Sequence, residues 1–160
     1  MKIKYMKGDM FKHVFPKGQN KVFLHGCNAQ GVMGSGVAAQ IKKLYPEAYE
    51  AYRLKHSLEG LILGDVVFSH DYTTNTSVMN AITQQYYGRD KKTVYVDYKV
   101  IEECIKLVDE ECRISQWLYE DTIEVVMPKI GCGLANGDWN VVSAIIEEHS
   151  NNFIPVVYEL

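Results

Sequence analysis

The longest apolar runs in the chain are residues 21–27 and 122–127, and neither run alternates with polar positions. A run without alternation predicts a strand that is covered on both faces. We therefore predict two central strands of one sheet. The pattern also predicts a short opening strand at residues 3–6 and a last strand at residues 153–158 that completes the sheet.

Residues 64–69 and 77–83 are rich in β-branched and apolar positions, and a polar turn at residues 71–75 separates them. Two such segments joined by a polar turn are typical of a β-hairpin. The sheet is therefore predicted to contain antiparallel as well as parallel pairs.

Helical spacing follows the strand candidates at residues 21–27, 77–83 and 122–127. The first helix is predicted from the face shared by Val37, Ile41, Leu44 and Tyr45. Pro46 interrupts it and stands in the first turn of a second helix over residues 47–55, where proline is tolerated.

Two further helices each begin at an aspartate. Asp97 is placed as the N-cap of a long amphipathic helix, and Asp138 as the N-cap of the last one. Their inner faces are Ile101, Cys104, Ile105, Val108 and Cys112, and Val142, Ile145 and Ile146. Strands alternating with helices predict a three-layer α/β/α fold, with a mixed sheet of about six strands.

Composition narrows the class of protein. A chain of 160 residues fits one domain, residues 1–160, and no apolar run approaches the roughly 18 residues of a membrane span. The first residues lack the apolar region of a secretory signal, so we expect an intracellular, cytoplasmic protein. The four cysteines form no C-x-x-C pair, and the sequence indicates neither a metal site nor a cofactor.

The formal net charge is −3 and no block of basic residues occurs. This balance argues against nucleic acid as a partner, because nucleic acid binding needs a basic footprint. A small anion held by backbone N–H groups remains compatible, since that mode of binding needs no basic side chain.

Residues 27–38, which we call the first glycine loop, follow a predicted central strand and lead into a helix. They contain the pattern G-x-x-G-x-G, which differs from both the dinucleotide fingerprint and the P-loop. Glycines allow close backbone approach, and the N–H groups of a helix start favour an anion. The loop is thus either a phosphate cradle or only a tight connection.

Residues 130–137, the second glycine loop, repeat this arrangement after the other central strand. Ligands of open α/β sheets bind outside the carboxyl ends of the strands. We therefore predict one anion site shared by both loops, with two independent structural turns as the alternative.

In this order, the motifs at residues 7–11, 25–38, 127–134 and 157–160, together with Trp139, resemble the macro domain family over essentially the whole chain. The likeness is to the branch that holds the yeast and phage-type ADP-ribose 1″-phosphate phosphatases and the terminal ADP-ribose protein glycohydrolase. It implies a mixed six-stranded sheet and a cleft for ADP-ribose.

The resemblance also implies which residues bind the ligand. They are Asp9, Met10, Cys27, Asn28, Gly34, Ser35, Gly36, Val37, Ile130, Gly131, Cys132, Gly133, Leu134, Ala135 and Tyr158. In the family, the residue matching Asp9 takes the adenine amino group. The first glycine loop surrounds the distal ribose and phosphate, and the second wraps the diphosphate. From the residues alone, Asp9 is equally a turn or cap residue, and Tyr158 is more often a core aromatic.

Departures from the family pattern bear on the reaction. Where the glycohydrolase has a nucleophilic lysine and an aspartate, this chain has Gln84 and Gln85 at the first place and Ala135 at the second. His25, by contrast, matches the histidine at the head of the loop in the phosphatases. A histidine that becomes cationic near pH 7 suits proton donation to a leaving oxygen, but His25 is equally a buried strand histidine.

Three functions are compatible with these residues. The favoured one is removal of the terminal phosphate from ADP-ribose 1″-phosphate. The alternatives are a non-catalytic ADP-ribose-binding module and a hydrolase of ADP-ribosyl or acetyl-ADP-ribose esters. All three take a small nucleotide ligand, without nucleic acid or a membrane as partner.

Overall fold

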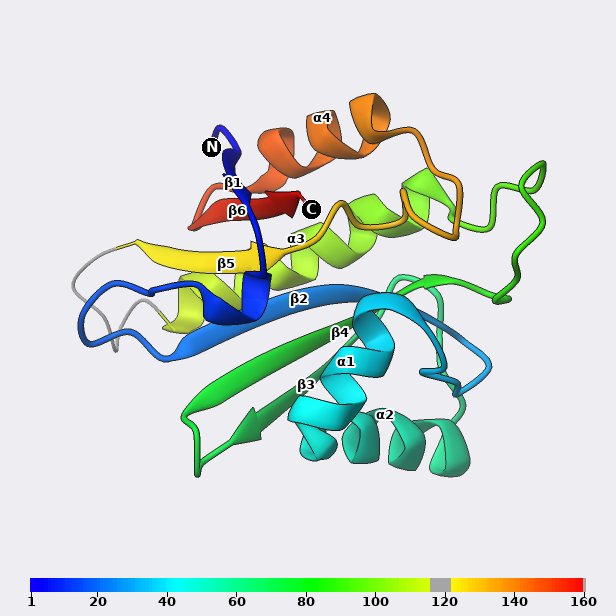
Figure 1. Ribbon diagram of the computed structural model, residues 1–160, viewed down its shortest axis with the longest axis horizontal. Coiled ribbons are helices and arrows are strands. Elements are labelled where there is room, and N and C mark those ends of the chain that lie inside the picture. The colour runs from blue at the N-terminus through cyan, green and yellow to red at the C-terminus, as the bar shows by residue number, and fades with distance from the viewer. Residues whose placement is uncertain (116–121, 160) are drawn as a thin grey trace.

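A computed structural model describes residues 1–115 and 122–159, and Leu160 of the terminal motif lies outside them. Its single sheet has the order β1-β6-β5-β2-β4-β3 (Figure 1). The strands are β1 (Lys4–Lys7), β2 (Lys21–Asn28), β3 (Val66–Asp71), β4 (Thr76–Gln84), β5 (Ile123–Met127) and β6 (Phe153–Glu159). All neighbours pair in parallel except β3 and β4, which form the antiparallel hairpin that the sequence predicts.

Helices cover both faces of the sheet, as predicted. They are the 3₁₀ helix η1 (Met10–Lys12), α1 (Gly36–Leu44), α2 (Pro46–Leu58), α3 (Tyr98–Ser115) and α4 (Trp139–His149). Helices α1 and α2 pack on one face, and α3 and α4 on the other (Figure 1). The mixed six-stranded α/β/α fold is therefore confirmed.

The central strands owe their positions to burial. All five residues of β5 are buried, and Phe23 and Leu24 of β2 are fully buried on opposite faces. The last strand, β6, also lies inside the sheet, between β1 and β5, so that the two edges are β1 and β3.

The helix starts are confirmed in detail. The side chain of Asp97 accepts from the N–H of Lys99 (3.0 Å), and that of Asp138 accepts from the N–H of Asn140 (2.9 Å). Pro46 is the first residue of α2. An aspartate at such a position satisfies N–H groups that the first helical turn leaves without an acceptor.

Two local predictions need correction, and one short element was not predicted. Helix α2 continues to Leu58, beyond the predicted end at residue 55. Leu44, predicted on the inner face of α1, is 48% exposed because the helix ends there. The turn after β1 contains η1, which the sequence pattern does not predict because three residues give no periodicity.

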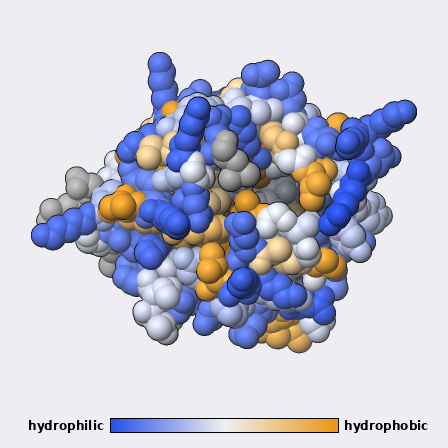
Figure 2. Space-filling model, viewed as in Figure 1, coloured by the Kyte–Doolittle hydropathy of each residue, from blue (hydrophilic) through white to orange (hydrophobic). Residues whose placement is uncertain are grey.

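Several findings bear on the kinds of ligand and partner. In the described part of the chain, no helix is long and apolar enough to cross a membrane. No group of three or more metal-ligating side chains occurs among those same residues. Figure 2 shows a largely hydrophilic face on which apolar residues form small separate patches.

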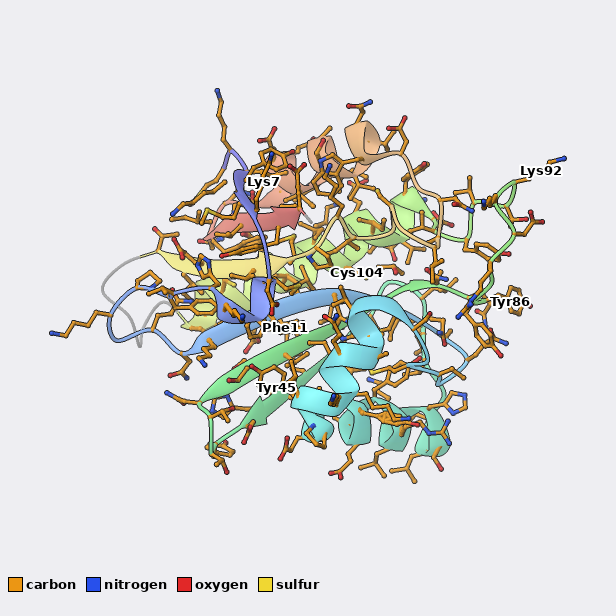
Figure 3. All side chains as sticks on the ribbon, viewed as in Figure 1. Lys7, Phe11, Tyr45, Tyr86, Lys92 and Cys104 are labelled. Carbon is orange, nitrogen blue, oxygen red and sulfur yellow. The ribbon has the colours of Figure 1, made fainter. Side chains whose placement is uncertain are left out.

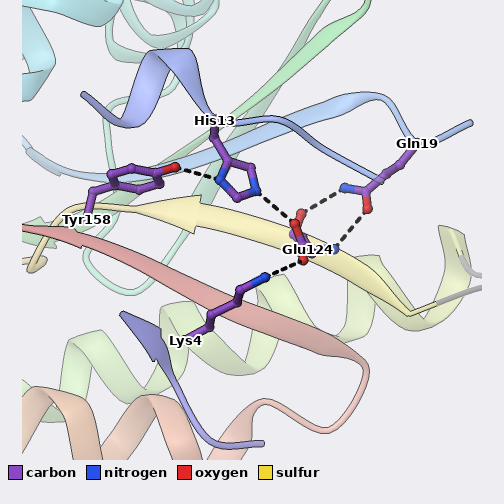
Figure 4. Close-up of polar contacts among 5 residues, drawn as sticks. All are labelled: Lys4, His13, Gln19, Glu124 and Tyr158. Carbon is purple, nitrogen blue, oxygen red and sulfur yellow. Dashed lines mark hydrogen bonds and ion pairs between the residues drawn. The ribbon is translucent and has the colours of Figure 1, made fainter. Parts of the chain in front are cut away.

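A buried carboxylate connects β1, β5 and β6. Glu124 of β5 accepts through Oε1 from Nε2 of His13 (2.8 Å), and His13 Nδ1 is hydrogen-bonded to the Tyr158 hydroxyl (2.7 Å) (Figure 4). The main chain of Glu124 exchanges two hydrogen bonds with the Gln19 amide, and Lys4 Nζ lies 3.7 Å from Oε2. Because each buried polar group has a partner, the network fixes the chain after η1 against the sheet.

Truncation at Glu124 tests this role. We expect Glu124→Ala to lower the free energy of unfolding by about 2–4 kcal/mol, since the buried Nε2 of His13 then has no acceptor. Lys4→Ala is the matched control, because its half-exposed ammonium contributes less than about 1 kcal/mol. Urea unfolding measures both. Equal losses in the two variants would show that the His13–Glu124 bond stabilises nothing beyond a surface pair.

Candidate functional site

The parallel order β5-β2-β4 brings the carboxyl ends of three strands to one edge of the sheet. The first glycine loop follows β2, and the second follows β5. Residues 85–97, which we call the β4–α3 loop, follow β4. In open α/β sheets this edge is where ligands bind.

A cavity of about 480 Å³ lies at this edge, a size typical of small-ligand sites. From the first glycine loop and the strand before it, the lining is His25, Gly26, Cys27, Asn28, Val32, Gly34, Ser35, Gly36, Val37 and Ala38. The rest is Thr83, Gln84, Tyr87, Gly88, Arg89, Pro128, Lys129, Ile130, Gly131, Gly133, Leu134 and Ala135. Both glycine loops therefore line one cavity, as a shared site requires, and the binding of an anion there stays a prediction.

The Asn28 side chain holds the first glycine loop in shape. Its Nδ2 donates to the Val32 carbonyl (2.7 Å), and its Oδ1 accepts from the N–H of Gln30 (3.0 Å). The buried Tyr52 hydroxyl of α2 donates to the Asn28 carbonyl (2.6 Å). The amide predicted to contact the ligand is thus engaged in organising the loop around it.

The start of α1 leaves hydrogen-bonding groups open toward the cavity. Ser35 occupies the N-cap position, but its hydroxyl makes no capping bond. None of the described residues accepts from the N–H groups of Gly36, Val37 or Ala38. A hydroxyl and three N–H groups at a helix N-terminus form a ready acceptor site for anionic oxygens.

His25 is buried, with 1% of its surface exposed, and its neighbour on β4 is Asn80. The Asn80 amide donates to the carbonyls of Val67 (3.1 Å) and Ala48 (3.3 Å), so its Oδ1 accepts from His25 Nε2 at 2.6 Å. Burial lowers the pKa of His25 to about 4. The expectation that this imidazole becomes cationic near pH 7 is therefore wrong, and its catalytic role stays a prediction without that support.

Burial also makes the cysteines near the site unreactive. Burial raises the pKa of the Cys27 thiol far above its usual value, and that of Cys132 to about 11. Since the thiolate is the nucleophile, neither is activated at neutral pH. Cys27 belongs to a buried apolar cluster and Cys132 packs against the main core cluster, so both thiols serve as small packing groups.

Charge in the cavity is one-sided. Among the described residues, no aspartate or glutamate lines the cavity, although the whole chain carries a net charge of −3. Its cations are Arg89 and Lys129, and Nζ of Lys129 is paired with Glu159 Oε1 at 2.7 Å. Together with the open N–H groups, this lining favours an anionic ligand over a cationic one.

Four of the predicted ligand residues do not line this cavity: Asp9, Met10, Cys132 and Tyr158. Asp9 is exposed and accepts from the N–H of Phe11 (3.0 Å), so it caps η1. Met10 is buried, and the Tyr158 hydroxyl belongs to the Glu124 network. Their roles toward a ligand stay predictions.

The sequence pattern missed the side chains that come from the β4–α3 loop and from the end of β5. The exception is the pair Tyr86 and Tyr87, which the sequence predicts to overhang the cleft: Tyr87 lines the cavity, and Tyr86 does not. Arg89 and Lys129 were not predicted. The signal that could have found them is position, because both follow strands whose carboxyl ends share the edge.

A family model described as the Macro domain matches residues 24–146, and this chain belongs to the Macro domain family. The ADP-ribose 1″-phosphate phosphatase of Candida albicans is 24% identical over 149 residues, which are 93% of this chain and 94% of that protein. A solved structure of a Bacteroides thetaiotaomicron protein of unknown function is 32% identical, with a TM-score of 0.82 and coverage of 100% and 99%. A macrodomain protein from Streptomyces coelicolor is 25% identical, with a TM-score of 0.75 and coverage of 99% of both chains.

The buried, neutral His25 makes stability depend on pH. The unfolded chain takes up this proton near pH 6.5, whereas the native protein takes it up only near pH 4. Its contribution is complete above pH 6.5 and is lost as the pH falls toward 4, by roughly 3 kcal/mol. Urea unfolding between pH 7 and pH 4 should show a shallower loss for His25→Gln than for the wild type. Identical pH profiles would contradict the lowered pKa.

Proposed function

We propose that this protein removes the terminal phosphate from ADP-ribose 1″-phosphate. The proposal rests on one observation, the cavity at the ends of β2, β4 and β5, which the described residues line with open N–H groups and cations but with no carboxylate. The name of the Candida albicans relative supports the choice of substrate. The ligand of the site is accordingly ADP-ribose or its 1″-phosphate.

The chemistry follows from what the cavity can stabilise. Water attacks phosphorus and the bond from phosphorus to the anomeric oxygen breaks. That oxygen takes up the proton that the attacking water loses and becomes the hydroxyl of ADP-ribose. N–H groups at the start of α1 and the Ser35 hydroxyl stabilise the charge on the phosphoryl oxygens. Such stabilisation needs no nucleophile from the protein, and neither thiol at the site is activated to supply one.

A second candidate is an ADP-ribose-binding module without catalysis. It is favoured by the protonation states at the site, since His25 carries no imidazolium proton at pH 7 to give to the leaving oxygen. In the described part of the chain, no carboxylate lines the cavity to act as a general base. The same cradle would bind ADP-ribose in either case, so that binding alone does not separate the two functions.

The cradle is tested by placing a carboxylate in it. A Cβ at Gly34 would meet only Val32 Cγ1 at 3.5 Å, and one at Gly133 would have nothing within 4 Å, so both positions accept a side chain. We expect Gly34→Glu and Gly133→Glu to weaken ADP-ribose binding roughly 10- to 100-fold by repelling the diphosphate. Gly34→Gln is the uncharged control. Calorimetry that finds equal affinity for the Glu and Gln variants would remove that loop from the anion site.

Phosphate release separates the two functions. The wild type should release phosphate from ADP-ribose 1″-phosphate, and Gly34→Glu should depress both release and ADP-ribose binding, because the cradle contacts substrate and product alike. In ¹⁸O-labelled water, the label should enter phosphate. Tight binding of ADP-ribose with no phosphate release would overturn the phosphatase proposal in favour of the binding module.

A further inference from the structure

Arg89 is the uncommitted cation of the cavity. Lys129, the other lining cation, is held by Glu159 at 2.7 Å and lies 5.8 Å from the Trp139 ring. No ion pair engages Arg89 within the described residues. Its neighbour Asp90 faces its own turn instead, where it accepts from the N–H of Lys92 (2.9 Å) and the hydroxyl of Thr93 (2.9 Å).

The β4–α3 loop that carries Arg89 is fastened to both glycine loops. On one side of Arg89, the Tyr87 N–H donates to the Gln30 side chain of the first glycine loop (3.0 Å). On the other side, the Asn136 side chain of the second glycine loop donates to the carbonyl of Asp90 (2.8 Å). Arg89 therefore lies between two anchored residues of the loop, and it lines the cavity.

Gly88 makes this path possible. A Cβ at residue 88 would overlap the Tyr95 hydroxyl, which itself accepts from the N–H of Asp90 (3.1 Å). Only glycine allows the loop to pass so close to that ring. These contacts hold the main chain of Arg89 in place without using its side chain.

We propose that Arg89 binds the terminal phosphate of the substrate and so distinguishes ADP-ribose 1″-phosphate from its product, ADP-ribose. The assignment rests on the proposed function of the site and names the group that gives it specificity. A guanidinium matches the oxygens of a phosphomonoester with two parallel hydrogen bonds. A phosphomonoester carries nearly two negative charges at pH 7, whereas the product has a neutral hydroxyl in its place. Because Arg89 has no other ionic partner among the described residues, its attraction to the ligand is strongest for the one with the additional phosphate charge.

Equilibrium binding of two ligands tests the proposal. The probes are ADP-ribose and its 1″-methylenephosphonate analogue, which keeps the terminal charge and cannot be hydrolysed. The wild type should prefer the analogue. Arg89→Gln should lose roughly 10- to 100-fold in affinity for the analogue, and less than about twofold for ADP-ribose. The affinity of Arg89→Lys for the analogue should lie between those of the wild type and Arg89→Gln, because lysine keeps the charge and loses the paired geometry.

Lys92→Gln is the matched control. Lys92 is exposed on the same loop, points away from the body of the protein in Figure 3, and does not line the cavity. It should leave both affinities unchanged. An equal loss for both ligands in Arg89→Gln would place the guanidinium at the diphosphate and overturn the proposal, as would a comparable loss in Lys92→Gln or no loss in Arg89→Gln. Preference for the analogue is measured without turnover, so failure of phosphate release would refute the proposed reaction and leave this result standing.

Discussion

Parallel pairing of β2 with both β4 and β5 is the constraint on which the site depends. Parallel neighbours end at the same edge, so that three connections must leave the sheet side by side. Each connection leads to a helix, and the covering helices bury the strands that feed them. The same pairing that builds the core therefore builds the cavity.

Hydrogen bonds from asparagine side chains hold the loops at this edge, where no pairing between strands can hold them. Asn28 fixes the first glycine loop, Asn136 ties the second to the β4–α3 loop, and Asn80 orients His25 inside the sheet. An amide can donate and accept at once, which suits buried places where two main-chain segments meet. Because these bonds exist without ligand, the N–H groups at the start of α1 need little reorganisation when an anion binds.

The sequence predicts the parts of this structure that depend on local patterns. Continuous apolar runs identified β2 and β5, and the aspartates before α3 and α4 marked their starts. The glycine loops indicated the edge where the cavity lies. The position of Arg89 could not be predicted, because its anchors join residues 57 and 46 positions apart. Nor could the protonation of His25, since burial and not the local sequence lowers its pKa.

The pairing of β1 with β6 has a consequence for how the chain folds. Lys4 lies opposite Val156, so β1 joins the sheet only beside β6, which follows the other five strands of this sheet in sequence. Pairing β1 with β6 closes a long loop of chain, and such closure is slow. The sheet can nucleate on β2, β4 and β3, whose pairings are closer in sequence, with β1 joining at the end. The edge strand β1 would then be the last element to gain protection against hydrogen exchange during folding.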